Sequence, residues 1–378
     1  MSISPRDFFD LLKKKDVNFF TGVPDSLLKE FCLCLDDLAA DNHIIAANEG
    51  NAIALAAGYH LGTGKLPLVY MQNSGLGNAV NPLLSLCDPE VYSIPMLVVI
   101  GWRGEPGVAD EPQHKKQGLV QEDLLNALDL PYIVLSADDT SADKKVEQAI
   151  SSAINGNRPS VILVKKGTFD KYGKSSAETT EDLITREEAL EVILADLPDD
   201  AIIVSTTGKT SREIFEIRAA RSEPHNKDFL TVGSMGHCSS IALGIALAQP
   251  DRKIFCIDGD GALIMHMGGL ATIGKLQPNN FYHILINNRV HESVGGQKTA
   301  AEIIDIPGLV KSNGYKTVLS CSDKDQLITN LERFIQEAGP AFLDLLVKPG
   351  SRANLGRPTV TPVENKTAFM KFIANAKE

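Results

Sequence analysis

The stretch Cys256-Ile257-Asp258-Gly259-Asp260-Gly261 marks a change from an apolar strand pattern to a helical one. The strand is expected over 253–258 and the helix over about 266–276, so Gly259 and Gly261 fall on the turn between them. Such a turn presents backbone N–H groups and the positive end of a helix, which suit a diphosphate. Asp260 offers a carboxylate ligand to a hard divalent cation that bridges phosphate oxygens. The stretch therefore predicts an α/β fold with an anion and metal site at the carboxyl end of a strand.

Asn287 and Asn288 form a second polar cluster at the end of another apolar strand, expected over 283–287. An amide oxygen at this point can complete an oxygen-only metal shell beside the first turn. Gly-Asp-Gly alone also fits an ordinary strand-to-helix turn. It is not a dinucleotide-binding fingerprint, because no Gly-x-Gly-x-x-Gly opens a helix here.

Glu49 is a candidate catalytic carboxylate in the amino-terminal half. It follows a short apolar strand at 43–47 and begins an Ala-rich helix expected to run to about Leu61. A glutamate at a helix start often only complements the helix dipole. However, the run 52–58 has almost no polar face, so the helix and Glu49 are expected to be buried on several sides. Burial raises the pKa of a carboxyl group, as proton exchange with a ring nitrogen requires.

Composition and charge exclude several classes of function. The 378 residues are 43% hydrophobic and 22% charged, typical of a globular protein long enough for two domains. The net charge of −11 offers no basic surface for nucleic acid. There is no apolar run of membrane-spanning length, so neither membrane insertion nor secretion is expected. The six cysteines form no Cys-x-x-Cys pair, which favours reduced thiols in a cytoplasmic protein.

Both halves of the chain open with a helix cap and continue as alternating strands and helices. Ser4 and Pro5 begin a helix that leads to a strand at 17–22, and Thr185 with Glu188 begins one that leads to a strand at 201–205. Further apolar strands are expected at 43–47, 67–71, 95–100, 131–135 and 160–164, and at 229–232, 253–258, 283–287, 315–318 and 341–347.

This alternation predicts two doubly wound α/β domains with largely parallel sheets. A polar segment at 171–184 is the expected linker between a first domain, 1–170, and a second domain, 185–378. The two halves look like a pseudo-repeat with diverged roles.

The Gly-Asp-Gly turn, Asn288 and Glu49 resemble the motifs of thiamine diphosphate-dependent decarboxylases. The two halves resemble the pyrimidine-binding and diphosphate-binding domains of that family, without its middle domain. Four blocks look like the phosphonopyruvate decarboxylase family and the related sulfopyruvate decarboxylases. They are specific as a set, although each alone would pass for a turn-rich loop: 21–26 (TGVPDS), 72–78 (QNSGLGN), 101–107 (GWRGEPG) and 110–114 (DEPQH).

The resemblance implies a Mg²⁺ site formed by Asp260, Asn288 and the backbone carbonyl of Val290. Asn287 is the alternative ligand if the register is shifted by one. Glu49 would bond the aminopyrimidine ring of the cofactor. The other implied cofactor contacts are Thr207, Gly208, Lys209, Gly233, Met235, Gly259, Gly261 and Ala262, among which Met235 also fits a simple core residue and Lys209 could serve the substrate instead.

A substrate with an anionic tail needs cationic or imidazole donors. His114 and His291 are the preferred catalytic candidates among the basic residues expected in loops or turns, because they can also move protons near neutral pH. Each also fits an ordinary solvated residue. Weaker candidates for substrate contact or support are Asn73, Ser74, Arg103, Lys115, Arg212, Glu213 and Asp258.

The implied reaction is the decarboxylation of 3-phosphonopyruvate to phosphonoacetaldehyde, on the way to 2-aminoethylphosphonate. The alternatives are sulfopyruvate decarboxylation, carboligation, and cofactor binding without catalysis. In the family the cofactor lies between subunits, so a homo-oligomer, at least a dimer, is implied. Two segments are candidates to close over the site, 289–297 and 352–362, and the second could equally be an ordered strap.

Overall fold

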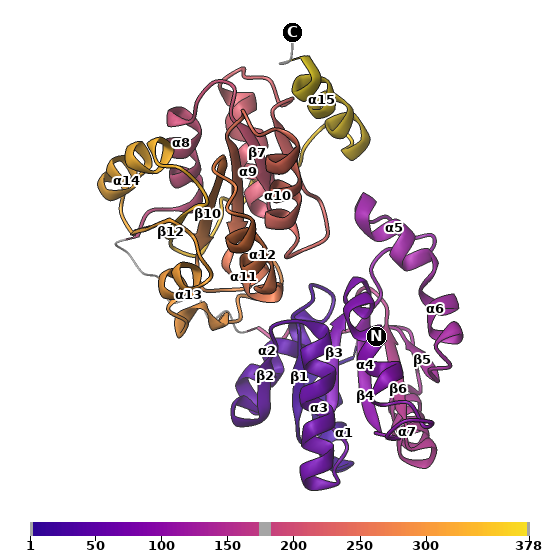
Figure 1. Ribbon diagram of the computed structural model, residues 1–378. Coiled ribbons are helices and arrows are strands. Elements are labelled where there is room, and N and C mark those ends of the chain that lie inside the picture. The colour runs from indigo at the N-terminus through magenta and orange to yellow at the C-terminus, as the bar shows by residue number, and fades with distance from the viewer. Residues whose placement is uncertain (1–2, 174–182, 376–378) are drawn as a thin grey trace. The chain divides into compact units, whose positions relative to one another are not determined.

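The computed structural model describes residues 3–173 and 183–375 and divides into two compact units (Figure 1). The first unit holds the amino-terminal half together with Val294–Gln297, and the second holds the remainder. The expected linker at 171–184 lies largely outside the described residues, so the domain boundaries stay a prediction. Within the described ranges, no helix is long and apolar enough to span a lipid bilayer.

The first unit is built on a six-stranded sheet with the order β2-β1-β3-β4-β6-β5. Every pairing in it is parallel. Its central strands are continuous apolar runs because helices cover both faces. The strands are β1 (Phe20–Gly22), β2 (His43–Ile45), β3 (Leu68–Gln72), β4 (Met96–Gly101), β5 (Tyr132–Leu135) and β6 (Pro159–Val164).

The second unit has its own six-stranded parallel sheet, with the order β11-β12-β10-β9-β7-β8. Counted within each half and read from one edge, both sheets have the order 2-1-3-4-6-5. The structure thus confirms the predicted fold class and the pseudo-repeat. The strands are β7 (Ile202–Ser205), β8 (Asp228–Leu230), β9 (Ile254–Gly259), β10 (Phe281–Asn287), β11 (Thr317–Cys321) and β12 (Ala341–Leu346).

Helices cover both faces of the first sheet. One face packs against α1, α2 and α7 and the other against α3, α4 and α6, so the sheet lies between two apolar cores. The elements of this unit are α1 (Pro5–Lys14), α2 (Lys29–Leu38), η1 (Ala40–Asn42), α3 (Glu49–Thr63), η2 (Asn73–Gly75), α4 (Leu76–Ser85), α5 (Pro112–Leu119), α6 (Gln121–Ala127) and α7 (Ala142–Gly156).

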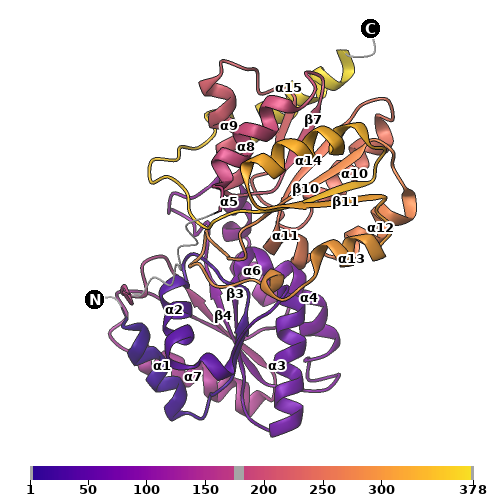
Figure 2. The same cartoon turned by 90° about the vertical axis from the view of Figure 1, so that its left-hand side faces the viewer.

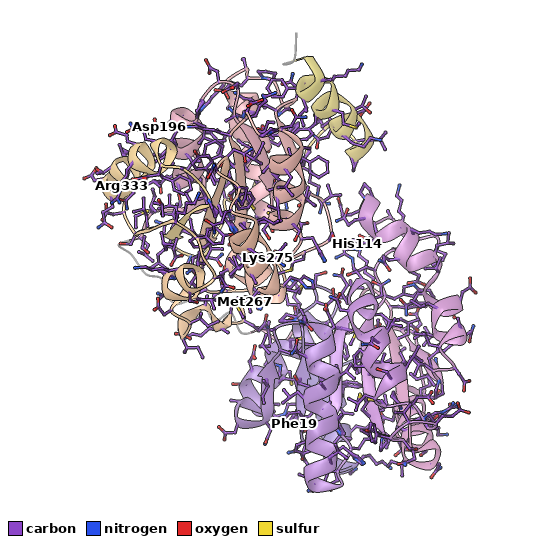
Figure 3. The ribbon with its side chains drawn as sticks, in the orientation of Figure 1. Phe19, His114, Asp196, Met267, Lys275 and Arg333 are labelled. Carbon is purple, nitrogen blue, oxygen red and sulfur yellow. The ribbon has the colours of Figure 1, made fainter. Side chains whose placement is uncertain are left out.

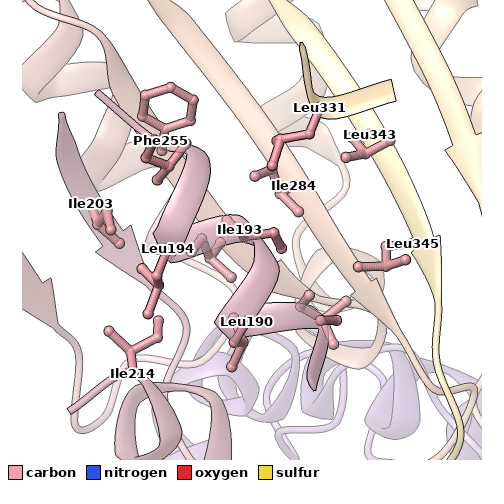
Figure 4. Close-up of a cluster of buried hydrophobic side chains, with 14 of the residues drawn as sticks. Leu190, Ile193, Leu194, Ile203, Ile214, Phe255, Ile284, Leu331, Leu343 and Leu345 are labelled. Carbon is pink, nitrogen blue, oxygen red and sulfur yellow. The ribbon is translucent and has the colours of Figure 1, made fainter. Parts of the chain in front are cut away.

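The second sheet is covered in the same way. One core joins the sheet to α8, α9 and α14, with Leu190, Ile284 and Leu343 at its centre (Figure 4). The opposite core includes α10, α12, α13 and α15 (Figure 2). The elements are α8 (Arg186–Asp196), α9 (Lys209–Ala220), α10 (Cys238–Ala248), α11 (Asp260–Met265), α12 (Gly268–Leu276), η3 (Ala300–Glu302), α13 (Ile306–Ser312), α14 (Lys324–Gln336) and α15 (Pro362–Asn375).

The two predicted helix caps are present. The Ser4 side chain accepts a hydrogen bond from the backbone N–H of Asp7 at 3.3 Å. Thr185 and Glu188 form a complete capping box, in which each side chain bonds the backbone of the other. The first turn of α1 is therefore held by one capping bond and that of α8 by a reciprocal pair.

The helix after the Gly-Asp-Gly turn begins earlier than predicted. Asp260 is itself the first residue of α11, and α12 follows after a break at His266. Gly261 is tolerated there because the first N–H groups of a helix have no intrahelical partner. The consequence for the site is direct, since the Asp260 carboxylate lies at the helix start rather than on a turn before it.

Candidate active site

Asp260 is the carboxylate that follows β9. It is 3% exposed, and Thr299 Oγ1 donates a hydrogen bond to its Oδ2 at 2.5 Å. Burial nevertheless raises the pKa of Asp260 to about 6, because the groups that oppose it are this hydroxyl and backbone N–H groups rather than a cationic side chain. A divalent cation would provide the positive charge that this carboxylate lacks. The residues at this strand end therefore fit a Mg²⁺ ion.

Asn287 is the last residue of β10, and Asn288 follows it. Both lie next to Asp260, as the N–H of Asn288 points at the Asp260 carboxylate. Asn288 Oδ1 accepts from the N–H of Val290 at 3.2 Å, and its amide donates to Glu292 at 3.0 Å. Asn287 donates to Asp344 at 3.1 Å, while its buried Oδ1 has no partner in the described part of the chain. Asn288 and Val290 are thus side by side, and the choice between the two asparagines stays a prediction.

Gly261, Met235 and His291 meet at one point. A Cβ atom on Gly261 would lie 3.1 Å from His291 Cε1 and 3.5 Å from Met235 Cε. Because Gly261 has no side chain, the backbone at the start of α11 stays uncovered, although the side chains of His291 and Met235 lie close to it. Desolvation lowers the pKa of His291 to about 4, so its imidazole is neutral near neutral pH. It can donate or accept one hydrogen bond there, but it brings no charge.

The turn from β7 to α9 carries Thr207, Gly208 and Lys209. Gly208 has φ of 100°, a conformation that residues with a Cβ rarely adopt. Lys209 starts α9, and its Nζ donates to Glu292 Oε1 at 2.5 Å. The turn thus brings backbone N–H groups and one cation to the same sheet edge as Asp260.

A buried ion-pair network supports this turn. Arg186 donates to both oxygens of Glu213 at 2.6 and 2.8 Å and to Glu292 at 2.7 Å. Burial alone would raise the pKa of Glu292, but Arg186 and Lys209 lower it below its ordinary value. Glu292 therefore stays ionised and links the Lys209 turn to Asn288. Glu213 is thus paired with Arg186.

Arg212 was also expected in a loop or turn, but it lies on α9, whereas Lys209 is the first residue of that helix. Arg212 Nε donates to the carbonyl of Gly356 at 2.6 Å, and Gly356 N donates to Glu216 Oε1 at 2.8 Å. Segment 352–356 is thus fastened to α9, as an ordered strap would be. The donors of Arg212 that make these bonds are not directed at a substrate.

The remaining predicted residues of this half lie at the same edge of the sheet. Gly233 and Met235 are in the connection from β8 to α10, and Ala262 is buried on α11. Asp258 Oδ1 accepts from the N–H of Gly259 at 2.9 Å, so Asp258 steadies the turn.

Glu49 begins α3 in the first unit and is 5% exposed. Burial raises its pKa, against a hydrogen bond that Asn78 Nδ2 donates to its Oε2 at 2.7 Å. Gly75 lies against the carboxylate, where a side chain would collide with it. The expected burial of Glu49 is confirmed. The helix is not buried on every side, because Leu55 is 38% and Leu61 70% exposed.

Arg103 follows β4 and is held by Asp110. Its Nε donates to Asp110 Oδ2 at 2.8 Å and its Nη1 to Ser26 Oγ at 2.8 Å. This pairing lowers the pKa of Asp110 to about 2. The Arg103 charge is therefore already compensated within the unit.

His114 and Lys115 lie on α5, not in a loop as predicted (Figure 3). His114 is 8% exposed, and desolvation together with the Arg103 charge lowers its pKa to about 4. Asn73 bridges to the next loop, because its Nδ2 donates to the carbonyl of Arg103 at 2.8 Å, and Ser74 donates to Gln72 Oε1 at 2.7 Å. The Arg103 and Asn73 loops thus form one hydrogen-bonded edge.

Both halves of the chain match family models. Residues 6–127 match the N-terminal TPP binding domain of the thiamine pyrophosphate (thiamine diphosphate) enzymes, and residues 207–345 match the C-terminal TPP binding domain. A phosphonopyruvate decarboxylase of Streptomyces viridochromogenes is 36% identical over 94% of this chain and 91% of that protein. This chain belongs to the phosphonopyruvate decarboxylase family. A second such relative, from Streptomyces hygroscopicus, is 36% identical over 98% of this chain and 94% of that protein.

A sulfopyruvate decarboxylase of Methanosarcina acetivorans is more distant, at 26% identity over 96% of this chain and 95% of that protein. These matches confirm the family resemblance and the enzyme class predicted from the sequence. The chain is a carbon–carbon lyase that carries out thiamine diphosphate-dependent decarboxylation. The roles of individual site residues stay predictions.

Sequence reasoning missed several residues that hold the site together. Thr299 bonds Asp260, Asn78 bonds Glu49, and Asp25 is fully buried and accepts from Gln72 Nε2 at 2.7 Å. Asn78 and Asp25 lie inside motif blocks, so a buried polar residue could have been sought there. Thr299 carries no local signal, because its bond to Asp260 spans 39 positions.

Proposed function

We propose that this chain decarboxylates 3-phosphonopyruvate to phosphonoacetaldehyde and carbon dioxide, with thiamine diphosphate and Mg²⁺, in phosphonate biosynthesis. The observation that carries the proposal is 36% identity to two phosphonopyruvate decarboxylases over almost the whole chain. The sulfopyruvate decarboxylase covers as much of the chain at only 26% identity, which makes sulfopyruvate the second candidate substrate.

The second unit would hold the diphosphate and the metal. Asp260, Asn288 and the Val290 carbonyl would bind Mg²⁺, and the N–H groups of the Gly208 turn and of Gly261 would meet phosphate oxygens. The raised pKa of Asp260 supports this assignment, because a cation beside it would favour the ionised carboxylate.

Glu49 would exchange a proton with the aminopyrimidine ring. Bound thiamine diphosphate supplies a nucleophilic carbon and an electron sink for the charge left when carbon dioxide departs. Burial raises the pKa of the Glu49 carboxyl group, and a carboxyl group with a raised pKa is better suited to proton exchange, which supports this role for Glu49. Asn78 would keep its carboxyl group oriented.

The phosphonate tail would need at least one cation that is not already paired. Arg103 is paired with Asp110 and Lys209 with Glu292. Lys115 is exposed on α5 and has no carboxylate partner among the described residues. Lys115 would therefore supply charge, while the neutral imidazoles of His114 and His291 would donate hydrogen bonds or move protons.

A homo-oligomer, at least a dimer, in the cytoplasm is part of the proposal. Its support is that α3 leaves two large apolar side chains in water, Leu55 at 38% and Leu61 at 70% exposed. Exposed apolar side chains of this size favour burial against a partner.

The test measures carbon dioxide release from 3-phosphonopyruvate, sulfopyruvate and pyruvate, with thiamine diphosphate and Mg²⁺ present. We expect 3-phosphonopyruvate to have the highest kcat/KM, and Glu49→Gln to lose turnover with all three acids. Higher kcat/KM for sulfopyruvate would transfer the proposal to that acid. No release from any of them by cofactor-loaded protein would overturn it.

A further inference from the structure

α10 covers one face of the second sheet (Figure 2). Four side chains of types that can bind metals, Cys238, Cys256, Asp258 and His283, lie on that face. Cys256 on β9 and His283 on β10 are Cα partners in the parallel pairing, so both side chains leave the sheet on the same face. Asp258 is two residues further along β9 and shares that face. Cys238 is the first residue of α10 and points down onto it.

The four side chains are close together and excluded from water. Cys238 Sγ lies 3.2 Å from Cys256 Sγ, and the ligand atoms of Cys238, Cys256 and Asp258 all lie within 4.8 Å of one another. His283 Nε2 lies 3.5 Å from Asp258 Oδ2. None of the four residues is more than 2% exposed.

Asp258 Oδ2 and His283 Nε2 face each other at 3.5 Å, and neither atom has a hydrogen-bond partner in the described part of the chain. A buried polar atom left in this way costs about 1–3 kcal/mol, and folded proteins rarely keep one. Each side chain is anchored at its other end. Asp258 Oδ1 accepts from Gly259 N at 2.9 Å, and His283 Nδ1 lies 3.2 Å from the Tyr315 hydroxyl. Asp258 therefore presents Oδ2 to the two sulfurs, and His283 presents Nε2 toward Asp258 Oδ2.

We propose that Cys238, Cys256, Asp258 and His283 bind one Zn²⁺ ion as a closed, tetrahedral structural site. Thiolate, imidazole and carboxylate are the protein ligands of zinc, and four protein ligands leave no open position for chemistry. Two sulfurs at about 2.3 Å from a tetrahedral ion are about 3.8 Å apart, so the thiols must separate by roughly half an ångström. A disulfide of about 2.05 Å would require about twice that displacement, in the opposite direction.

One further feature of the surroundings suits this ion. The Tyr315 hydroxyl fixes the His283 ring and leaves Nε2 for the metal, as outer hydrogen bonds do in zinc sites. The site differs from the one at Asp260 by its sulfur ligands, which select zinc over magnesium. Its effect would be to fasten α10 to β9 and β10.

The experiment is Co²⁺ substitution in the full-length protein, together with elemental analysis of protein produced with zinc in the medium. We expect about one zinc per chain. After refolding with Co²⁺ we expect thiolate-to-metal charge-transfer absorption and the visible bands of tetrahedral cobalt. Cys256→Ser should lose the charge-transfer band. Cys321→Ser, which changes another buried free thiol of the same unit, should keep it.

Two more variants separate this site from its alternatives. Asp260→Asn should keep the charge-transfer band, because an oxygen-only magnesium site gives none. Tyr315→Phe keeps the ring and should weaken zinc affinity about tenfold in a chelator competition. The proposal is overturned by folded wild-type protein that contains no zinc and shows no charge transfer with Co²⁺. A Cys238–Cys256 disulfide found by mass spectrometry, or a band that survives in Cys256→Ser, would overturn it equally.

Discussion

β3 in the first half and β9 in the second occupy the same place in the same strand order, but the residues that follow them act differently. After β3, Asn73 donates to the next loop, and Gln72 at the strand end donates to Asp25. After β9, Asp260 begins a helix at once and is bonded by Thr299, and no cationic side chain of the described residues balances its charge. At the end of β3 the polar side chains bond one another and the neighbouring loop. At the end of β9 the Asp260 carboxylate keeps a charge that a ligand could balance.

The strands next to them repeat the contrast. Arg103 after β4 is bonded to Asp110 and Ser26, whereas Asn288 after β10 belongs to a network that ends on Lys209. The two sheets therefore share one strand order, and the few residues that follow each strand determine the chemistry at its edge.

Asp260→Asn should have the largest effect, because it removes the charge of the expected metal ligand. Turnover should fall by about a thousandfold or more, together with thiamine diphosphate binding. Calorimetry with cofactor and Mg²⁺ measures the second effect. Asp251→Asn, an exposed acid before β9, is the matched control. Unchanged metal-dependent binding in Asp260→Asn would remove Asp260 from the metal site.

Glu49→Gln should reduce turnover much more than cofactor affinity, which would distinguish the role of the first sheet's edge from that of the second. Turnover should fall about 10²- to 10⁴-fold, the usual share of a general acid–base group. Cofactor affinity should change by less than about tenfold, since the diphosphate contacts are in the other half. Steady-state rates and calorimetry on the same samples give both numbers. Glu90→Gln, an exposed glutamate in the same half, should alter neither. A parallel loss of binding and turnover would make Glu49 a binding residue.

Glu292→Gln tests the buried network in the absence of cofactor. It leaves Arg186 and Lys209 without one carboxylate, so we expect a loss of about 2 kcal/mol in the free energy of unfolding. Asp110→Asn makes the corresponding change beside Arg103 and should cost less, because the Arg103 side chain is 18% exposed and that of Arg186 only 5%. Urea denaturation compares the two. A larger loss of unfolding free energy in Asp110→Asn than in Glu292→Gln would show that burial of the arginine does not determine the loss.

His114 should make the stability of the first half depend on pH. The folded protein holds it neutral with a pKa of about 4, whereas the unfolded chain protonates it near pH 6.5. The contribution of neutral His114 to the free energy of unfolding is therefore complete above about pH 6.5. It is lost as the pH falls toward 4, and the loss is about 1–2 kcal/mol at pH 5. Denaturation at pH 7.5 and pH 5 should show this loss in wild type and a smaller one in His114→Gln. Equal losses in both proteins would contradict it.

The helix caps should give the smallest difference between the halves. Thr185→Ala removes a reciprocal capping box and should cost about 1 kcal/mol. Ser4→Ala removes one hydrogen bond of 3.3 Å and should cost about half as much. Melting temperatures of both variants, with Thr185→Ser as a control that keeps the hydroxyl, measure the difference. An equal cost would mean that the Glu188 side chain adds nothing.

Features that depend on local sequence were predictable. The apolar runs located β9 and β10, and the helix caps located α1 and α8, because burial period and capping are encoded within a few residues. The start of α11 was misplaced because two glycines suggest a turn, although an acidic residue at a helix start is favoured. Locally encoded chemistry, such as the buried Glu49, was predictable in the same way.

Contacts between distant residues were not predictable. Arg186 and Glu292 are 106 positions apart, and neither has a neighbour that signals the pair. The parallel register that places His283 beside Cys256 is likewise a property of the folded sheet. The partners of Asp260 and Arg212 are also distant in the sequence, so whether these side chains are free to bind a ligand could be judged only from the structure.

The order of strands within each sheet also governs when each half can fold during synthesis. β6 is the last strand of the first sheet, so that sheet has all its strands once residue 164 has left the ribosome. In the second sheet β12 lies between β11 and β10, and it is not made until residue 346. The nascent chain therefore carries a complete first half while β10 still lacks a neighbour on one side. That interval exposes an apolar strand edge on which a chaperone or a second nascent chain can act.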